Sequence, residues 1–174
     1  ETQDSITYTL KEDLSFSGFR TEDTVFAGSV FFNQLADHTR PASESVMTFT
    51  GTGMSMSFDD CSSIHSDRWV NDNEGGGAIR GETLTFTDMG DLSFNNCKSI
   101  VNADTNAGGA VNARGDITFS HMGNISFTNN MLGDDSQQGQ ALGGALFTWG
   151  KIDFENTKSI LFSGNSTGHS PTSA

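Results

Sequence analysis

The sequence predicts an all-β protein, a right-handed parallel β-helix of about five coils, and three observations carry this prediction. A Gly-Gly-Ala-aliphatic tetrapeptide recurs, beginning at Gly76, Gly108 and Gly143, with a spacing typical of repeat proteins. Each copy is followed by two short segments with apolar residues at positions i and i+2, the period of a strand with one buried face. The breaks between these segments are too short for a crossover helix, and parallel connections are nearly always right-handed.

The paired strands begin near the N-terminus and repeat through the chain. They are expected at residues 6–8 and 14–16, 47–49 and 56–58, 84–86 and 92–94, 117–119 and 125–127, and 152–154 and 160–162. Each coil is expected to contain a third short strand. In the second copy the segment from Ala27 to Val30 substitutes for the tetrapeptide.

Residues 1–174 are predicted to form a single β-helix that is a fragment of a longer one. Residues 1–32 make the N-terminal coils, 33–45 a surface loop, 46–168 the regular coils and 169–174 a tail. No polar cap is visible after the last repeat, so further coils are expected to follow.

Phenylalanines recur at two fixed places in the coil and define the expected core. One column contains Phe86, Phe119 and Phe154, and the other contains Phe16, Phe58, Phe94, Phe127 and Phe162. Burial of each ring contributes about 1.5 to 3 kcal/mol, so both columns are predicted to face inward.

The chain is strongly acidic, with a net charge of −13 and a sequence pI near 4.3. Such a surface repels nucleic acid and anionic lipid, so neither is an expected partner. No apolar run is long enough for a membrane-spanning helix. No signal peptide is visible, which fits a processed or truncated chain.

The position three residues after the second phenylalanine carries a distinctive pattern. It is Asn130 and Asn165 in the last two coils, where stacked asparagines are expected to form a hydrogen-bonded ladder. In two earlier coils it is Cys61 and Cys97. Equivalent positions on successive coils lie about 4.8 Å apart, which makes a disulfide feasible in an oxidising compartment. The alternative is two reduced core thiols, because parallel stacked side chains do not naturally adopt the disulfide torsion.

Paired carboxylates raise the alternative of a polysaccharide-active β-helix enzyme, a lyase or hydrolase. The pairs are Asp59 with Asp60, Asp88 with Asp91, and Asp134 with Asp135. None is accompanied by a recurring Lys or Arg on a strand face, which such chemistry needs to stabilise an enolate or to bind a uronate. We therefore expect no catalysis and no cofactor.

The histidines give no indication of a metal site. They lie in separate turns without the spacing of metal ligands, at His38, His65, His121 and His169.

Two columns of hydroxyl side chains favour a more remote alternative, ordering of water or ice on a flat β-helix face. They contain Thr7, Thr48, Thr85 and Thr118, and Thr9, Thr50, Thr87 and Ser120. Asp153 and Glu155 break the pattern in the last coil, and Thr is also a good exposed strand residue.

The alternation of Gly-Gly-Ala-aliphatic and Phe-x-x-Asn motifs resembles the chlamydial polymorphic membrane proteins, which are autotransporter adhesins. The matching residues are Gly76, Gly77, Ala78 and Ile79; Gly108, Gly109, Ala110 and Val111; Gly143, Gly144, Ala145 and Leu146; Phe127 and Asn130; and Phe162 and Asn165. The resemblance covers residues 75 to 165 well and the N-terminal third only through degenerate copies. Cys61 and Cys97, where the family pattern has Asn, are the departure from it.

The resemblance implies a virulence-associated passenger domain on the bacterial outer membrane, or secreted after processing, that attaches to host epithelial cells. It also implies a translocator barrel outside this sequence and a binding role for the matching motif residues. The expected partner is a host cell-surface protein, with self-association through the ends of the β-helix as a further possibility.

Loops that vary while the coil stays constant are the expected binding elements of such a solenoid. They are Asn33 to Ser45, Ile64 to Glu74 and Gly133 to Gln140. Trp69, in the second loop, is the expected anchor, because Trp is enriched in binding hot spots.

Overall fold

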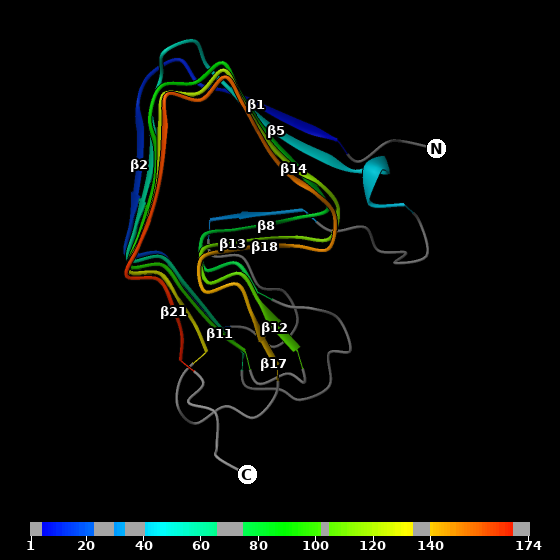
Figure 1. Ribbon diagram of the computed structural model, residues 1–174, viewed down its shortest axis with the longest axis vertical. Helices are drawn as coiled ribbons and strands as arrows, with labels where there is room; N and C mark the ends of the chain where they lie inside the picture. Colours follow the sequence, from blue (N-terminus) through cyan, green and yellow to red (C-terminus); the bar gives the residue numbers. More distant parts are fainter. Residues whose placement is uncertain are drawn as a thin grey trace.

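The chain winds into five stacked coils whose strands pair in parallel (Figure 1), which confirms the predicted all-β parallel β-helix. This computed structural model describes residues 5–22, 30–33, 41–65, 75–101, 105–133 and 140–168. Within these ranges the only helical element is one 3-10 turn, η1 (Ala42–Glu44). None of the described residues belongs to a helix with the length and apolarity of a membrane span.

The first two strands of every coil form two five-stranded sheets, and these are the strand pairs predicted from the sequence. Sheet A contains β1 (Ile6–Thr9), β5 (Val46–Thr50), β9 (Thr83–Thr87), β14 (Ile117–Ser120) and β19 (Ile152–Glu155). Sheet B contains β2 (Leu14–Ser17), β6 (Met56–Asp59), β10 (Leu92–Asn95), β15 (Asn124–Thr128) and β20 (Ser159–Ser163).

Three further sheets complete the coil. A third strand was predicted for each coil without a position. The strand after the tetrapeptide lies in sheet D, with β4 (Phe31–Phe32), β8 (Ile79–Gly81), β13 (Val111–Ala113) and β18 (Leu146–Thr148). Sheets C and E were not predicted. Sheet C contains β3 (Arg20–Glu22), β7 (Ser62–His65), β11 (Lys98–Val101), β16 (Met131–Leu132) and β21 (Ser166–Thr167). Sheet E contains β12 (Thr105–Ala107) and β17 (Gln140–Leu142).

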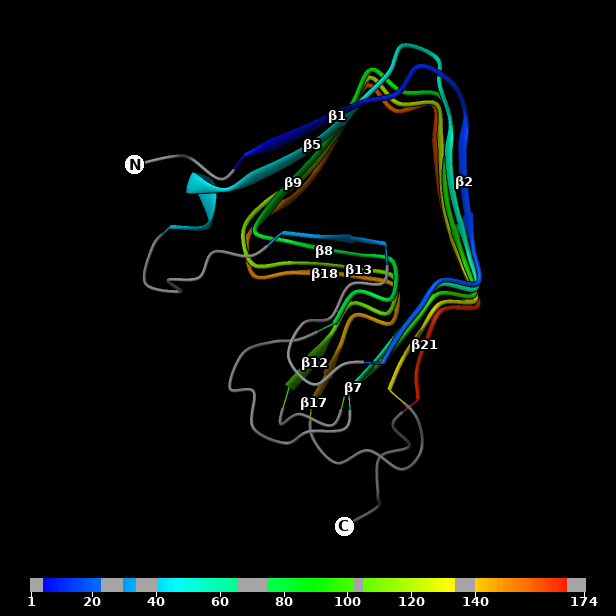
Figure 2. The same ribbon diagram turned by 180° about the vertical axis from the view of Figure 1, so that it is seen from behind.

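Sheets A, B and D form the three sides of a triangle, and sheets C and E extend from it (Figure 1). The view from behind shows the same strands lying over one another from coil to coil (Figure 2). The chain thus passes from sheet A to B to C, returns through E, and crosses D before the next coil.

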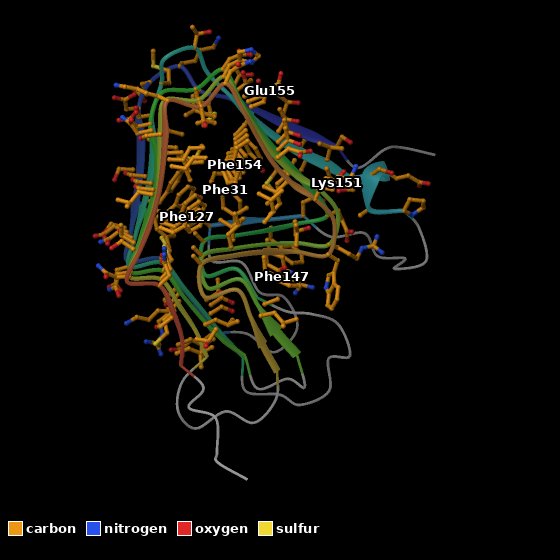
Figure 3. The ribbon with its side chains drawn as sticks, viewed as in Figure 1. Phe31, Phe127, Phe147, Lys151, Phe154 and Glu155 are labelled. Carbon is orange, nitrogen blue, oxygen red and sulfur yellow. The ribbon has the colours of Figure 1, made fainter. Side chains whose placement is uncertain are left out.

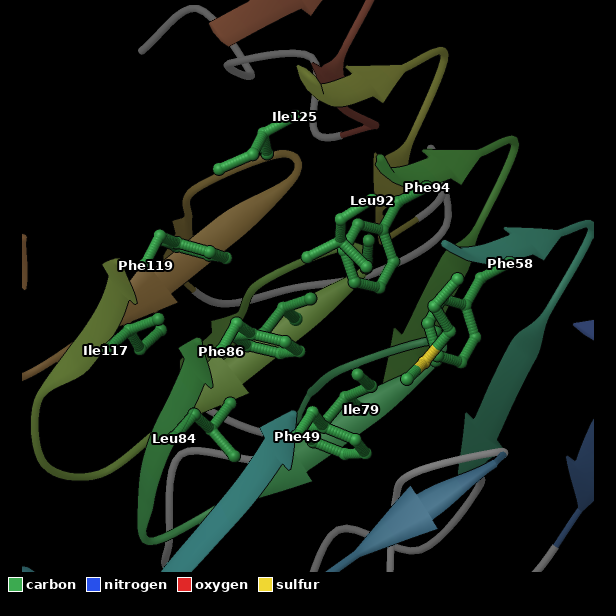
Figure 4. Close-up of a cluster of buried hydrophobic side chains, with 14 of the residues drawn as sticks. Phe49, Phe58, Ile79, Leu84, Phe86, Leu92, Phe94, Ile117, Phe119 and Ile125 are labelled. Atoms are coloured by element: carbon green, nitrogen blue, oxygen red, sulfur yellow. The ribbon is translucent and has the colours of Figure 1, made fainter. Parts of the chain in front are cut away.

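Apolar side chains from sheets A, B and D fill the triangle, with the two predicted aromatic columns in its centre (Figure 4). Phe49, Phe86 and Phe119 stack with ring centroids 5.0 Å apart. Phe58, Phe94 and Phe127 stack at 4.8 and 4.9 Å. These distances match the separation of paired strands, so in-register pairing stacks the rings automatically.

The N-terminal coil differs from prediction by one residue. Phe31, not Val30, lies opposite Ile79 in sheet D, whereas the repeat pattern predicts Val30 at that position. The Phe31 ring makes edge contacts with the columns, 4.9 Å from both Tyr8 and Phe49 and 5.4 Å from Phe16. The large ring fits here because it fills the inside of the first coil, where Tyr8 and Phe16 are only partly buried.

Core positions become exposed in the last coil. Phe154 is 36% and Phe162 50% exposed, although each stacks on a buried phenylalanine of the coil before it. Strand geometry still directs both side chains inward, so this end presents apolar side chains together with the edges of β19, β20 and β21.

Candidate functional site

The Gly-Gly-Ala motif forms the corner at which the chain enters sheet D. Its first glycine has positive φ in all three copies, 90° at Gly76, 67° at Gly108 and 72° at Gly143. That backbone conformation favours glycine because a side chain would strain it. The N–H groups of Gly76, Gly77 and Ala78 donate to the equivalent carbonyls of the next coil at 2.8 to 3.0 Å. The corner is therefore a stacked, hydrogen-bonded scaffold.

The Phe-x-x-Asn motif forms the predicted ladder where sheet B passes into sheet C. Asn130 Oδ1 accepts the Cys97 backbone N–H at 2.9 Å, and Asn130 Nδ2 donates to the Phe94 carbonyl at 3.1 Å. Asn165 repeats the pattern one coil later, accepting from the Asn130 N–H at 2.9 Å and donating to the Phe127 carbonyl at 2.8 Å. Each asparagine side chain thus ties its own coil to the coil before it.

The two motifs meet in space, which the sequence analysis did not anticipate. A Cβ built on Gly77 would lie 2.4 Å from the Lys98 carbonyl oxygen. A Cβ on Gly109 would lie 2.7 Å from the carbonyl carbon of Met131, and Gly144 approaches Ser166 in the same way. Lys98, Met131 and Ser166 directly follow the ladder positions. The second glycine of one motif therefore packs on backbone beside the ladder residue of the other.

The exposure of the motif residues differs between coils. The tetrapeptides that begin at Gly76 and Gly108 are buried, as are Phe127 and Asn130. At the C-terminal end of the described stack, Gly144, Ala145, Leu146, Phe162 and Asn165 line an open cavity of about 330 Å³. Within the described residues, motif side chains are thus accessible at this end, and the predicted binding role of these motifs stays a prediction.

Cys61 and Cys97 occupy ladder positions, and both side chains are fully buried. The Cys97 thiol donates to the Phe58 carbonyl at 3.7 Å and the Cys61 thiol to the Phe16 carbonyl at 3.7 Å. Each thiol therefore contacts the carbonyl that an asparagine amide would reach. A disulfide between them stays a prediction, which non-reducing peptide mapping would check.

Replacing Cys97 by asparagine is expected to leave the protein at least as stable as the parent, because the amide can bond the Phe58 carbonyl. Asn130→Ala is expected to cost about 2 to 4 kcal/mol, since the Cys97 N–H and the Phe94 carbonyl would lose buried partners. Urea denaturation of the two variants measures both effects. A destabilised Cys97→Asn variant would contradict the equivalence of the two residues in the ladder.

The free energy of unfolding is expected to fall at alkaline pH through Cys97. A hydrogen bond with the Cys61 thiol, together with burial, raises the pKa of the Cys97 thiol above its ordinary value. The unfolded chain loses this proton near the ordinary value of 9.0 and then binds fewer protons than the folded protein. The stabilisation that the protonated Cys97 thiol contributes to the folded protein is therefore fully present below pH 9.0 and declines above it. Urea denaturation at several pH values above 9.0 checks this. The decrease of the free energy of unfolding with pH should be smaller in Cys97→Asn, which lacks the thiol.

The carboxylates considered for catalysis serve the turns between strands. Asp59 Oδ1 accepts from Asn95 Nδ2 at 2.6 Å, and Asp60 Oδ1 accepts from Asn96 Nδ2 at 3.0 Å. Hydrogen bonds from the backbone and side chain of Asn124 lower the pKa of Asp91. Asp59, Asp60 and Asp91 thus form hydrogen bonds with asparagines of the following coil. Asp134 and Asp135 lie outside the described residues.

Within the described residues, no three of His, Cys, Asp and Glu are grouped so that they could hold a metal ion. His121 sits at a corner with a φ of 53°, and its Nδ1 lies 3.8 Å from Asp88. His38 and His169 lie outside the described residues, as does the side chain of His65.

The two hydroxyl columns of sheet A are in register, as predicted. Thr85 lies opposite Thr48 and Thr118, and Thr87 lies opposite Thr50 and Ser120. Ser120 Oγ donates to Thr87 Oγ1 at 2.9 Å, so these hydroxyls also bond one another between coils.

Most of the predicted binding loops fall outside the described residues, Trp69 included. Asn33 and Ser45, the two ends of the first loop, are buried, and η1 lies just before Ser45. Ile64 and His65 belong to β7, and Gly133 follows β16.

Sequence reasoning missed an exposed corner where sheet D passes into sheet A. Trp149 is 56% exposed, and its ring packs edge-on against Phe147 with centroids 5.2 Å apart. In Figure 3, Phe147 lies on the side of sheet D away from the aromatic core, and Lys151 marks the corner. The equivalent corner of the coil before is Arg114-Gly115-Asp116. The sequence shows this tripeptide, but only the folded structure shows that it lies at a corner of the triangle.

Comparisons with protein-family models, with curated proteins and with solved structures gave no match.

Proposed function

We propose that this protein is a bacterial surface adhesin that attaches to host epithelial cells through the corners and loops of a rigid β-helix. The observation that carries the proposal is the contrast between a constant, ladder-bonded coil and the segments of varying length that interrupt it. A solenoid of this kind presents binding elements at fixed spacing on an extended surface. The motif pattern that resembles the chlamydial polymorphic membrane proteins supports the same function.

The partner in this proposal is a host cell-surface protein, and the protein acts without catalysis. The apolar side chains and strand edges of the last coil support a second contact, with another copy or a following coil. The proposed location, which suits both of these contacts, is the bacterial outer membrane, or the medium after processing.

Cell attachment tests the proposal. Beads coated with the protein are expected to bind cultured epithelial cells, and binding should fall when the loops at 34–40, 66–74 and 134–139 are replaced by short Gly/Ser turns. Circular dichroism of each variant serves as the fold control. Coated beads that bind no more cells than albumin-coated beads would refute the adhesin.

A product assay distinguishes the alternative function, a polysaccharide-active enzyme, from the adhesin. Release of sugars or of unsaturated products from acidic glycans would support the enzyme and count against the proposal. The in-register hydroxyl columns favour water ordering as a second candidate, for which thermal hysteresis of the purified protein is the measurement.

A further inference from the structure

The corner Arg114-Gly115-Asp116 connects β13 to β14 in a coil that has described neighbours on both sides. Its backbone is fixed by those neighbours. Arg114 N–H donates to the Gly81 carbonyl at 3.1 Å, Gly115 N–H donates to the Glu82 carbonyl at 2.6 Å, and the Asp116 carbonyl accepts from Leu84 at 3.0 Å. The tripeptide is therefore held in one conformation at an outer edge of the triangle.

The two charged side chains of this corner differ in their surroundings. Asp116 is exposed, and its Oδ1 accepts the Lys151 backbone N–H at 2.9 Å. The Arg114 side chain is 33% exposed, and its Nε pairs with the carboxylate of Glu82, which is buried. The corner thus presents the accessible carboxylate of Asp116 beside the Arg114 guanidinium, which is partly accessible and is held by Glu82.

A Cβ on the middle glycine would meet two neighbours. It would lie 2.6 Å from Thr83 Oγ1 and 2.8 Å from the Cβ of Ala42 in η1. Glycine at this position therefore lets η1 and Thr83 of the preceding coil pack closely against the corner. Arg114 and Asp116, separated by this one residue, are thus held over tightly packed backbone.

We propose that this corner binds a host receptor of the integrin type, which recognises Arg-Gly-Asp. Such a receptor takes the aspartate carboxylate as an oxygen ligand of its own divalent cation and the guanidinium into an acidic pocket. This inference rests on the proposed adhesin function and names the class of receptor. Glu82 restrains the guanidinium in the unbound protein, so the receptor competes with Glu82 for Arg114.

The test uses the whole chain and variants of Asp116. Asp116→Asn retains an oxygen that can accept the Lys151 N–H but removes the charge needed by the cation, and Asp116→Glu keeps the charge but displaces it by one methylene. Asp153→Asn, at an exposed carboxylate on β19 of sheet A, is the matched control. Arg114 is not replaced, because its loss would leave Glu82 buried without this ion pair.

Binding to immobilised Arg-Gly-Asp-binding integrin ectodomains is measured by surface plasmon resonance in Mn²⁺ and in EDTA. The parent and Asp153→Asn are expected to bind in Mn²⁺ only, and an Arg-Gly-Asp-Ser peptide should compete. Both Asp116 variants are expected to bind at least about tenfold more weakly. Absence of parent binding to every ectodomain, or full binding by Asp116→Asn, would overturn the inference.

The cell-attachment assay distinguishes this inference from the proposed function. If coated beads bind cells equally well with Asp116→Asn and in the presence of the peptide, the receptor class is wrong while the adhesin stands. If the parent protein binds an ectodomain but coated beads bind no cells, the corner is a receptor ligand while the adhesin proposal fails.

Discussion

Replacing Phe94 by alanine is expected to lower the free energy of unfolding by roughly 3 to 5 kcal/mol. The Phe94 ring is fully buried and stacks between Phe58 at 4.8 Å and Phe127 at 4.9 Å. In a solenoid, stability is close to a sum of terms within each coil and between neighbouring coils, so a void at this position weakens two interfaces at once. Denaturant titration followed by circular dichroism measures the loss.

Phe162→Ala is the matched control, because the same column position in the last coil is 50% exposed. It has one stacking partner among the described residues, Phe127 at 4.9 Å. We expect it to cost less than half as much as Phe94→Ala. Equal losses would mean that the column does not stabilise the protein by stacking between coils.

The aromatic columns and sheets A and B were predictable because short stretches of sequence contain the patterns that define them. Alternation at i and i+2 fixes which face of each strand is buried, and repetition fixes which strands pair, as in Leu92 opposite Ile125. The ladder was predictable for the same reason, since an asparagine at one offset from a repeated phenylalanine must stack on its equivalent.

Sheets C and E were missed because their strands are short and lack a clear alternation. β16 and β21 contain two residues each, and the inward position of sheet C is Ser63 or Ser99 in two coils but Leu132 in the next. Burial of a serine hydroxyl is not signalled by hydrophobicity. These strands follow from pairing with the coil before them, which is a tertiary effect.

The misplacement of Val30 has a related cause. No glycine pair precedes β4 in the sequence, so only small and aliphatic residues indicate where this repeat begins. The structure places Phe31 inward because the first coil has space for a ring among Tyr8, Phe16 and Phe49. Packing volume, which the local sequence does not state, decided the register.

The candidate site was predictable only in part. The sequence identified the repeated motifs, but not that Gly77 and Gly109 press against backbone beside the ladder. It also spelled out Arg114-Gly115-Asp116 without showing that three residues there turn the chain from one face of the triangle to the next. Exposure at a corner depends on how the coil folds around its core.

Gly109→Ala is expected to destabilise the protein by about 3 kcal/mol or more. The added Cβ would lie 2.1 Å from the Gly144 carbonyl oxygen and 2.7 Å from the carbonyl carbon of Met131. Met131 N–H donates to the Cys97 carbonyl, and Gly144 lies between Gly143 and Ala145, whose carbonyls accept from Gly109 and Ala110. Neither neighbour can therefore move without disturbing the stack. Thermal and urea denaturation measure the effect.

Gly18→Asn is the control for this substitution. Gly18 has a φ of 68° with nothing within 4 Å of an added Cβ, and its column already contains Asn96 and Asn129 at positive φ. We expect a change within about 0.5 kcal/mol, because asparagine tolerates the left-handed region.

The pair of variants separates two explanations of any adhesive effect of the Gly-Gly-Ala motif. If the motif is scaffold, Gly109→Ala should lose cell attachment and cooperative unfolding together, because the corners and loops lose their support. If the variant unfolds like the parent but no longer attaches, the motif itself contacts the receptor, and the close approach of Gly109 to Gly144 and Met131 is not what constrains this position.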